Sequence, residues 1–311
     1  MSDVTVIKIA IVGVGKIAQD QHVPSIKGNE AFELAATVSS RDGLPGIENH
    51  AQLTDLLEKR PDIPAVALCM PPQMRYEAAS LAIEAGRHVL LEKPPGATIA
   101  EVQDLVERAR AKNVSLFATW HSRFAAGVPA ARAWLAERMI RHVRITWKED
   151  VRRWHPGQAW IWEPGGLGVF DPGINALSIL TEILPEPVHL VQSTLEVPDG
   201  RQAPIAASLR FRGPAGLTVE ADFDWRQTGP QTWDIEIGTD TGSLSLSKGG
   251  AELTIGGRRE MTEADVEYAG IYRRFAELID AREIDVDLAP LIHVADAFML
   301  GRKITVEPFE E

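Results

Sequence analysis

The sequence predicts an α/β domain with a doubly wound parallel sheet, followed by an α+β domain with a large, mostly antiparallel and open-faced sheet. Residues 6–118 alternate short apolar runs with helical stretches, which is typical of parallel strands covered on both faces. Beyond about residue 122, β-like runs follow one another across Gly-Pro, Asp-Gly and Gly-Gly turns, which indicates antiparallel strands. The 311 residues are enough for two cores, and we place the domains at 1–122 and 123–311.

The elements of the first domain are predicted from apolar periodicity and from caps. A Thr at position 98 with Glu101 three residues later is a capping box, and it predicts where the last helix of this domain begins. The expected strands are Val6–Val12, Phe32–Val38, Ala65–Cys69, His88–Leu91 and Val114–Ala118, and the expected helices are Gln19–Ile26, Leu53–Lys59, Met74–Ala85 and Thr98–Ala111.

The second domain begins and ends with helices that enclose a run of strands. The expected helices are Val128–Glu137, Pro172–Ile183, Ala264–Ala281 and Leu288–Arg302, and the expected strands are Val188–Val197, Ile205–Phe211, Leu217–Phe223, Trp233–Gly238, Ser243–Ser247 and Glu252–Ile255. Whether the C-terminal helix packs back on the first domain stays open.

Composition excludes several classes of protein. The 32 Lys and Arg residues against 44 Asp and Glu residues give a net charge of −12, which repels nucleic-acid backbones. No apolar stretch approaches the roughly 18 residues of a membrane span, and the N-terminus lacks the basic region of a signal peptide. The single cysteine, Cys69, is expected to be a buried thiol in a cytoplasmic protein. The histidines show no metal-ligand spacing, so we expect no metal.

A glycine turn after the first expected strand predicts a dinucleotide site. Gly13, Gly15 and Ala18 form a GxGxxA pattern, in which the first glycine allows a tight turn and the second allows close approach of a pyrophosphate. Lys16 and Ile17 open the helix, whose N–H groups face such phosphates. A turn that binds nothing is the alternative. The strand–turn–helix context favours the dinucleotide.

The end of the second expected strand bears on cofactor choice. Enzymes that use NAD commonly place an acidic residue there for the ribose hydroxyl, whereas this chain has Ser39, Ser40 and Arg41, with Asp42 directly after them. Hydroxyls and a guanidinium suit a 2′-phosphate, so we expect NADP, with NAD also accepted. A solvated Arg41 is the alternative. Pro71, which follows the third expected strand, is a further expected cofactor contact.

Glu92-Lys93-Pro94 follows the fourth expected strand, and together with GxGxxA it resembles the Gfo/Idh/MocA family of oxidoreductases. The segments 119–123, 147–157 and 162–175 are similar to those of bacterial family members that oxidise L-arabinose and D-galactose at C1. The resemblance covers the whole chain. It implies a nicotinamide-dependent sugar dehydrogenase that yields an aldonolactone, and an assembly that is a homodimer or a homotetramer.

The resemblance also implies catalytic residues. Lys93 corresponds to the lysine that bonds the C1 hydroxyl, and Glu92 is a cofactor-site residue that orients it. Asp171 and Asn175 stand where the family usually has Asp and His. Because an amide accepts no proton, Asp171 is the expected base, alone or coupled to Lys93, and Asn175 orients hydroxyls. An Asp171 that only caps a helix is the alternative.

Aromatic and polar side chains of the second half supply the expected sugar contacts. Tryptophan offers a flat apolar face and one N–H donor, which suits the C–H faces and hydroxyls of a sugar. The expected substrate residues, besides Asp171 and Asn175, are His121, Glu149, Trp154, His155 and Trp233, and His155 is also a reserve base. Core packing is the alternative for the tryptophans.

Two other functions stay open. The same fold could serve a regulator that binds sugar and dinucleotide without turnover, although Lys93 and Asp171 are both present. A dehydrogenase that acts on another sugar or cyclitol carbon is the second alternative. L-Arabinopyranose and D-galactopyranose differ only by the exocyclic CH2OH group, so the sequence does not decide between arabinose, galactose and fucose.

Overall fold

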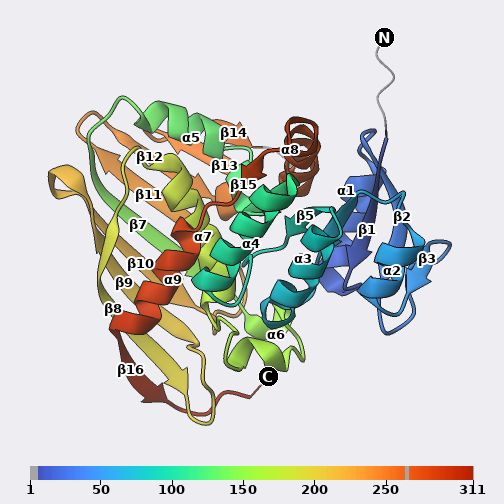
Figure 1. Ribbon diagram of the computed structural model, residues 1–311. Helices are drawn as coiled ribbons and strands as arrows, with labels where there is room; N and C mark the ends of the chain where they lie inside the picture. Colours follow the sequence, from blue (N-terminus) through green and yellow to red (C-terminus); the bar gives the residue numbers. More distant parts are fainter. Residues whose placement is uncertain (1–5, 263–265, 311) are drawn as a thin grey trace. The chain divides into compact units, whose positions relative to one another are not determined.

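The computed structural model describes residues 6–262 and 266–310 (Figure 1). Contacts divide the chain into two compact units. The first unit contains the described residues up to His121 together with Tyr268–Asp287, and the second contains Ser122–Glu267 and the described residues from Leu288 on. The segment Tyr268–Asp287 therefore joins the first unit, although it lies inside the range 123–311 of the second domain in our prediction. We keep a domain boundary near residue 122 as a proposal.

The first unit is built on a seven-stranded sheet in the order β15-β6-β5-β4-β1-β2-β3, in which every pair is parallel. The prediction of a doubly wound parallel sheet is confirmed. The strands are β1 (Ile7–Val12), β2 (Phe32–Val38), β3 (Glu48–His50), β4 (Ala65–Leu68), β5 (His88–Leu91), β6 (Leu116–Ala118) and β15 (Ile284–Asp285). The short edge strands β3 and β15 are not among the predicted ones.

Helices of the first unit follow the strands. They are η1 (Ala18–His22), α1 (Val23–Lys27), α2 (Leu53–Lys59), η2 (Pro72–Met74), α3 (Arg75–Glu84), α4 (Ile99–Lys112) and α8 (Glu267–Ala281), which belongs to this unit from Tyr268 on. The capping box of α4 is confirmed, because the Thr98 side chain accepts from Glu101 N–H and the Glu101 carboxylate accepts from Thr98 N–H. The predicted helix 19–26 is a π-helical turn followed by α1.

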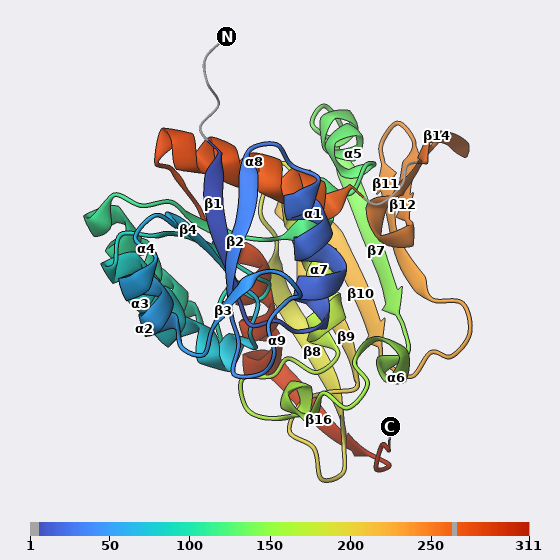
Figure 2. The same ribbon diagram turned by 90° about the vertical axis from the view of Figure 1, so that its right-hand side faces the viewer.

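Helix α8 supplies part of the core of the first unit, beside β1 and β2 (Figure 2). The Phe275 ring stacks on Phe32 at 5.9 Å and on Phe117 at 6.3 Å between centroids. Phe275 is fully buried, and burial of such a side chain contributes about 1.5–3 kcal/mol. Helix α8, although late in the sequence, is therefore part of the hydrophobic core of the first unit.

The second unit is built on a nine-stranded sheet in the order β14-β13-β12-β11-β7-β10-β9-β8-β16. The pairs β7–β10 and β8–β16 are parallel and the others are antiparallel, so the prediction of a mostly antiparallel sheet is confirmed. The strands are β7 (Ile140–Lys148), β8 (His189–Pro198), β9 (Ala206–Arg212), β10 (Thr218–Asp224), β11 (Thr232–Thr239), β12 (Ser243–Ser247), β13 (Glu252–Ile255), β14 (Arg258–Thr262) and β16 (Gly301–Val306).

Helices cover one face of this sheet. Figure 1 shows α5 (Val128–Leu135), α7 (Phe170–Ile183) and α9 (Ala289–Leu300) on the same side. Strand β10 turns Val219, Ala221 and Phe223 into the core, whereas Arg210 and Glu220 lie on the other face and pair there. Short turns α6 (Val151–Trp154) and η4 (Ala159–Trp162) connect β7 to α7.

Two predicted helices of the second half need correction. The predicted helix 288–302 ends at Leu300, because Gly301 adopts extended backbone and starts β16. A Cβ at Gly301 would lie 2.6 Å from Leu195 Cδ1, so close strand packing explains the glycine. The predicted helix 264–281 begins at Glu267, and residues 264 and 265 lie outside the described residues. None of the helices in the described residues has both the length and the apolar character that crossing a membrane requires.

Candidate active site

The glycine turn after β1 has the geometry that a dinucleotide requires. Gly13 has a φ of +89°, and a Cβ there would lie 2.9 Å from Met70 N, so the turn needs glycine. A Cβ built on Gly15 meets no described atom within 4 Å, which leaves room for a phosphate group. Helical backbone begins directly after it, at Lys16 and Ile17. These features fit the pyrophosphate of a dinucleotide.

The loop after β2 is held by hydrogen bonds that leave the arginine side chain exposed. Ser39 Oγ accepts from Arg41 N–H at 3.2 Å, and Asn49 Nδ2 donates to Ser39 O at 3.2 Å and to Arg41 O at 3.4 Å. Arg41 and Ser40 follow the strand that neighbours the glycine turn. The ordered loop suits recognition of the adenosine ribose. The cofactor roles of Ser39, Ser40 and Arg41 stay predictions.

Two further predicted cofactor residues, Lys16 and Pro71, have structural contacts. The Lys16 ammonium forms an ion pair with Asp20 one helical turn on. The carbonyl of Pro71 accepts from Met74 N–H at 3.1 Å and so begins η2. Neither contact decides whether these residues touch a cofactor, so both roles stay predictions.

The segment after β5 is fixed by a buried carboxylate. Glu92 is 3% exposed, and its Oε2 accepts from Lys93 N–H at 2.7 Å. Its Oε1 accepts from the Tyr268 hydroxyl at 2.6 Å and lies 3.0 Å from His22 Nε2. The buried Arg75 guanidinium donates to the carbonyls of Met70, Glu92 and Pro94. Lys93 itself is half-buried, so it is not a fully solvated surface lysine.

The surroundings of Glu92 lower the pKa of its carboxyl. Burial opposes ionisation, but hydrogen bonding and charge from His22, the charge of His121 and the Tyr268 hydroxyl outweigh it and lower its pKa to about 2. Burial would also lower the pKa of His22, but Cys69, Tyr272 and Glu92 hold it well above its ordinary value. His22 and Glu92 therefore form a buried charged pair at neutral pH.

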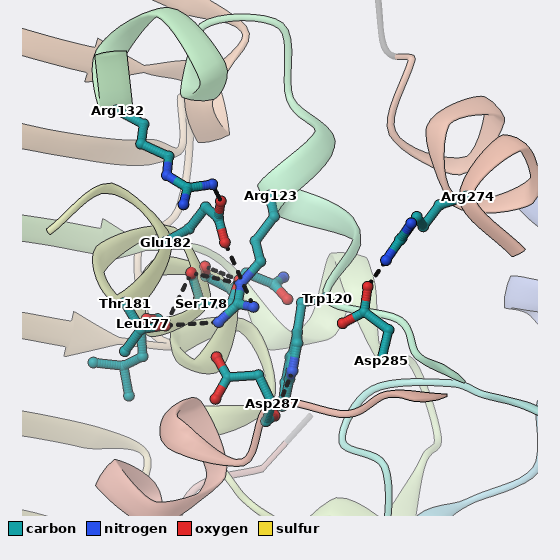
Figure 3. A network of polar contacts seen from close by, with 11 residues as sticks. Trp120, Arg123, Arg132, Leu177, Ser178, Thr181, Glu182, Arg274, Asp285 and Asp287 are labelled. Atoms are coloured by element: carbon teal, nitrogen blue, oxygen red, sulfur yellow. Dashed lines mark hydrogen bonds and ion pairs between the residues drawn. The ribbon is translucent and has the colours of Figure 1, made fainter. Parts of the chain in front are cut away.

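His121 is placed by the late segment of the first unit. Its ring stacks on Tyr268, with centroids 5.4 Å apart and planes 21° apart. Next to it, Trp120 Nε1 donates to Asp287 O at 2.8 Å, and Arg274 Nε bonds Asp285 at 3.0 Å (Figure 3). These contacts hold the His121 ring and its neighbour Trp120 against the segment Tyr268–Asp287. Its role toward a sugar stays a prediction.

In the second unit, Asp171 and Asn175 lie one turn apart in α7, on the same face. Asp171 is 3% exposed and lies in the first turn of the helix, whose N-cap is Val169, so Asp171 is not the N-cap residue, and its role as a base stays a prediction. Asn175 is half-buried. A Cβ at Gly168 would lie 2.3 Å from Pro204 O, so the chain reaches α7 through a turn that requires glycine.

Asp171 has a histidine partner from another element. His155 Nε2 lies 3.3 Å from Asp171 Oδ2, and the other ring nitrogen, Nδ1, lies 3.4 Å from Gln158 Oε1. The His155 ring packs on Trp225 at 5.2 Å between centroids. The carboxylate and the imidazole can therefore share or pass a proton, which the spacing of the sequence does not show.

The Glu149 carboxylate accepts hydrogen bonds from two indoles. Its Oε1 accepts from Trp225 Nε1 at 3.2 Å, and its Oε2 accepts from Trp233 Nε1 at 2.9 Å. The Trp233 ring in turn packs against Trp154 at 5.7 Å, and Trp154 Nε1 donates to Gln231 at 3.4 Å. Glu149 therefore orients an aromatic wall. Direct sugar contacts by Glu149, Trp154 and Trp233 stay predictions.

Helix α7 is anchored by an arginine network (Figure 3). Arg123 donates to Ser178 O at 3.0 Å and to Thr181 Oγ1 at 2.9 Å, and its guanidinium lies 3.6 Å from Glu182. Arg132 bonds the same carboxylate at 2.6 Å. These contacts fix the helix that carries Asp171 and Asn175.

Several residues of these clusters are absent from the prediction. They are His22, Trp225, Tyr268 and Tyr272, and their partners are far away in the sequence. A signal exists for the tyrosines, because residues four apart share one helix face. Within the described residues, no group of three or more His, Cys, Asp or Glu side chains is arranged to hold a metal ion.

The chain is similar in sequence to known oxidoreductases. A model of the Gfo/Idh/MocA family, an oxidoreductase family with an NAD-binding Rossmann fold, matches residues 7–119. A galactose 1-dehydrogenase from Pseudomonas fluorescens is 47% identical over 303 residues, which cover 97% of this chain and 98% of that protein. The chain belongs to the Gfo/Idh/MocA family of oxidoreductases.

Solved structures of this Gfo/Idh/MocA fold agree with that assignment. A D-galactose-1-dehydrogenase from Rhizobium etli is 56% identical and matches 100% of both chains with a TM-score of 0.96. A 3-ketoreductase from Actinomadura kijaniata, solved with NADP, is 19% identical, and the match covers 97% of this chain and 100% of that one with a TM-score of 0.84. At this low identity the similarity shows only that the two proteins share a fold. The resemblance inferred from the glycine turn and from Glu92-Lys93-Pro94 is confirmed.

Proposed function

We propose that this oxidoreductase is an aldose 1-dehydrogenase that oxidises D-galactose and L-arabinose, in their pyranose forms, at C1 to the aldonolactone. One observation of the structure carries the proposal: the buried Asp171 carboxylate is paired with His155 at 3.3 Å, beside an aromatic wall. The two relatives that are 47% and 56% identical are a galactose 1-dehydrogenase and a D-galactose-1-dehydrogenase. Their names favour galactose as the first substrate to test.

Oxidation at C1 removes a hydride from carbon and a proton from the anomeric hydroxyl. The nicotinamide cofactor, when bound, supplies the hydride acceptor. We assign proton removal to Asp171, with His155 as its partner, and stabilisation of negative charge on the C1 oxygen to the Lys93 ammonium. Asn175 donates and accepts hydrogen bonds without taking a proton, which suits orientation of a neighbouring hydroxyl.

The sugar wall is assigned to residues of the second unit. Trp154 and Trp233 offer flat apolar faces that suit the C–H face of a pyranose. Glu149 holds Trp233 through its indole N–H, so it contributes by orienting the ring. His121 and His155 supply polar ring atoms for hydroxyls.

For the cofactor we propose NADP, with NAD also accepted. The exposed Arg41 guanidinium and the hydroxyls of Ser39 and Ser40 support a 2′-phosphate, because the guanidinium binds phosphate in a bidentate manner. Gly13 and Gly15 support pyrophosphate binding, as described above.

We also propose that the protein is a homodimer or a homotetramer that uses the exposed face of the nine-stranded sheet. That face carries both charge signs, for example Arg144 paired with Glu220 at 2.9 Å, which suits an interface of identical copies. Light scattering of the purified protein tests this proposal, and a monomer over the working concentration range contradicts it.

The decisive experiment for the reaction follows cofactor reduction. The purified protein is given NADP or NAD with D-galactose, L-arabinose, D-fucose, D-glucose, D-xylose or myo-inositol, and the product is identified by nuclear magnetic resonance. We expect a 1,5-lactone from galactose and arabinose. A keto sugar would reassign the reaction to another carbon. Cofactor binding without reduction on any of the sugars would favour a non-catalytic sensor.

A further inference from the structure

A cluster of buried polar side chains in the first unit surrounds Glu92, the residue that the family resemblance assigns to the orientation of Lys93. His22 and Tyr272 are fully buried, Glu92 is 3% exposed and Tyr268 is 4% exposed. Apolar residues in these positions are often as stabilising or more so, because even a paired buried charge loses its hydration. The presence of such a cluster beside a proposed catalytic lysine therefore needs an explanation.

The hydrogen bonds of the cluster form a continuous chain that ends on Lys93. The Tyr272 hydroxyl lies 2.8 Å from His22 Nδ1, and His22 Nε2 lies 3.0 Å from Glu92 Oε1. Tyr268 donates to the same oxygen at 2.6 Å. The other oxygen of the carboxylate accepts the main-chain N–H of Lys93 at 2.7 Å. One carboxylate thus links the buried histidine to the backbone of the lysine.

The cluster also joins the glycine turn to the lysine. His22 ends the π-helical turn η1, which starts three residues after Gly15. Glu92 and Lys93 directly follow β5. The contact between His22 of η1 and Glu92 fixes the position of Lys93 relative to the glycine turn, and all of these residues belong to the first unit.

We propose that His22 is a positioning residue for Lys93: its ring, 3.0 Å from Glu92 Oε1, holds the carboxylate that binds the Lys93 main-chain N–H, and so keeps that backbone in the catalytic arrangement, with Tyr268 as a second donor. The proposal rests on the proposed function for the role of Lys93. It assigns to His22 a part in the chemical step without contact to the sugar.

The charges around Glu92 support this role. His22 from η1, His121 from η3 (His121–Phe124) and Tyr268 from α8 all favour its ionised form. Arg75 of α3 bonds the Glu92 main-chain carbonyl, and Cys69 faces His22 from the end of β4. Of these groups, His22 lowers the pKa of Glu92 the most, so its removal should raise that pKa more than the removal of any other.

The experiment replaces the imidazole by an amide that keeps a hydrogen-bond donor but carries no charge. His22→Gln is compared with the matched control His88→Asn. His88 begins β5, the strand that leads to Glu92, is also buried, and accepts from Ser115 N–H at 2.9 Å, a bond that an amide oxygen preserves. Both variants therefore lose a buried imidazole near the same sheet.

We expect His22→Gln to lower kcat by up to about 100-fold, because small displacements of a catalytic group cost that much, with an unchanged KM for NADP. A new fall in kcat should appear on the acid side, above the ordinary Glu pKa of about 4.3, because a buried carboxyl without its cationic partner is harder to ionise. Tyr268→Phe should show the same effects to a smaller extent. His88→Asn should show neither effect.

The proposal is overturned if His22→Gln keeps the wild-type kcat and pH profile, or if His88→Asn reproduces its losses. Tyr268→Phe, which preserves the ring that stacks on His121, keeps the test valid if His22→Gln does not fold. If the wild-type protein oxidises none of the sugars, that result contradicts the proposed function and not the role of His22. The ionised pair is then still tested without substrate, by the pH dependence of thermal unfolding in the wild type and in His22→Gln.

Discussion

The Asp171 carboxylate lies 3.3 Å from Nε2 of His155, although the two residues belong to different elements. Asp171 is in the first turn of α7, and His155 is the C-cap of α6. The family usually has a histidine where this chain has Asn175, one turn after Asp171. His155 thus brings an imidazole beside the carboxylate from the preceding loop, and we propose that it takes the role of the histidine that the family resemblance implies at position 175.

Asp171→Asn is expected to lower kcat by about 10²–10⁴-fold, because the amide cannot accept the proton of the anomeric hydroxyl. NADP affinity should stay nearly unchanged. Initial rates with D-galactose and fluorescence titration with NADP measure the two quantities. Asp150→Asn is the control, since Asp150 caps α6 and pairs with Arg152 without taking part in the proposed chemistry. Wild-type activity in Asp171→Asn would reassign the base.

His155→Gln is expected to lower kcat by on the order of tenfold, because Asp171 loses the ring that orients it. If the two side chains act as a unit, the double variant Asp171→Asn/His155→Gln should be no slower than Asp171→Asn alone. Rates of the four proteins in the cycle give the answer. Losses that simply multiply would show that His155 acts independently of Asp171.

Lys93→Met should lower kcat by about 10²–10⁴-fold, since the apolar chain fills similar space but stabilises no negative charge on the C1 oxygen. Lys112→Met is a suitable control, because Lys112 ends α4 and pairs with Glu84 at 2.7 Å. Steady-state rates at saturating NADP measure the effect. Equal rates for both variants would remove Lys93 from the reaction.

Arg41→Ala should raise the KM for NADP by about tenfold or more and leave the KM for NAD within about twofold, because only NADP carries the 2′-phosphate. The control is Arg110→Ala, an exposed arginine of α4 that pairs with Glu107. Kinetics with each dinucleotide at saturating sugar provide the comparison. Parallel increases for NADP and NAD would place Arg41 away from the phosphate.

The His22–Glu92 pair should make stability depend on pH on both sides of neutrality. The Glu92 pKa of about 2 lies below its ordinary value, so its contribution is present above about 4.5 and is lost as the pH falls through 2. The raised His22 pKa gives a contribution that is full below 6.5 and is lost as the pH rises through the folded-state value. Urea unfolding should therefore separate wild type from His22→Gln most between pH 4.5 and 6.5. A constant difference up to strongly alkaline pH would contradict the charged pair.

The part of the fold that follows from local patterns could be predicted from the sequence. The capping box gave the start of α4, and the alternation of Ser and Leu in Ser243–Ser247 gave β12. Strand β7 is not among the predicted strands, although its buried Val143, Ile145 and Trp147 alternate with more exposed residues, which is the pattern of a half-buried strand. Helix α8 was predicted as a helix, but the unit it joins depends on contacts with Phe32 and Phe117, which no local pattern contains.

The same division holds for the site. Gly13, Gly15 and the spacing of Asp171 and Asn175 are local features, and the structure gives them the expected geometry. The pairing of Asp171 with His155 joins residues 16 positions apart through a loop whose path the sequence leaves open. The two indoles that donate to Glu149 come from beyond β10, so these hydrogen bonds could not be predicted from local sequence, and a sugar contact by Glu149 stays a prediction.

Helix α8 has a consequence for how the protein matures on the ribosome. Residues up to His121 emerge early, yet the hydroxyls of Tyr268 and Tyr272 reach Glu92 and His22 only after most of the chain has been translated. Until then the first unit lacks the Phe275 ring that packs on Phe32 and Phe117, and Glu92 lacks the hydroxyl donor of Tyr268. A fragment that ends near residue 122 would lack Tyr268–Asp287 and could not complete the core of the first unit. We expect it to bind the cofactor more weakly than the full chain does.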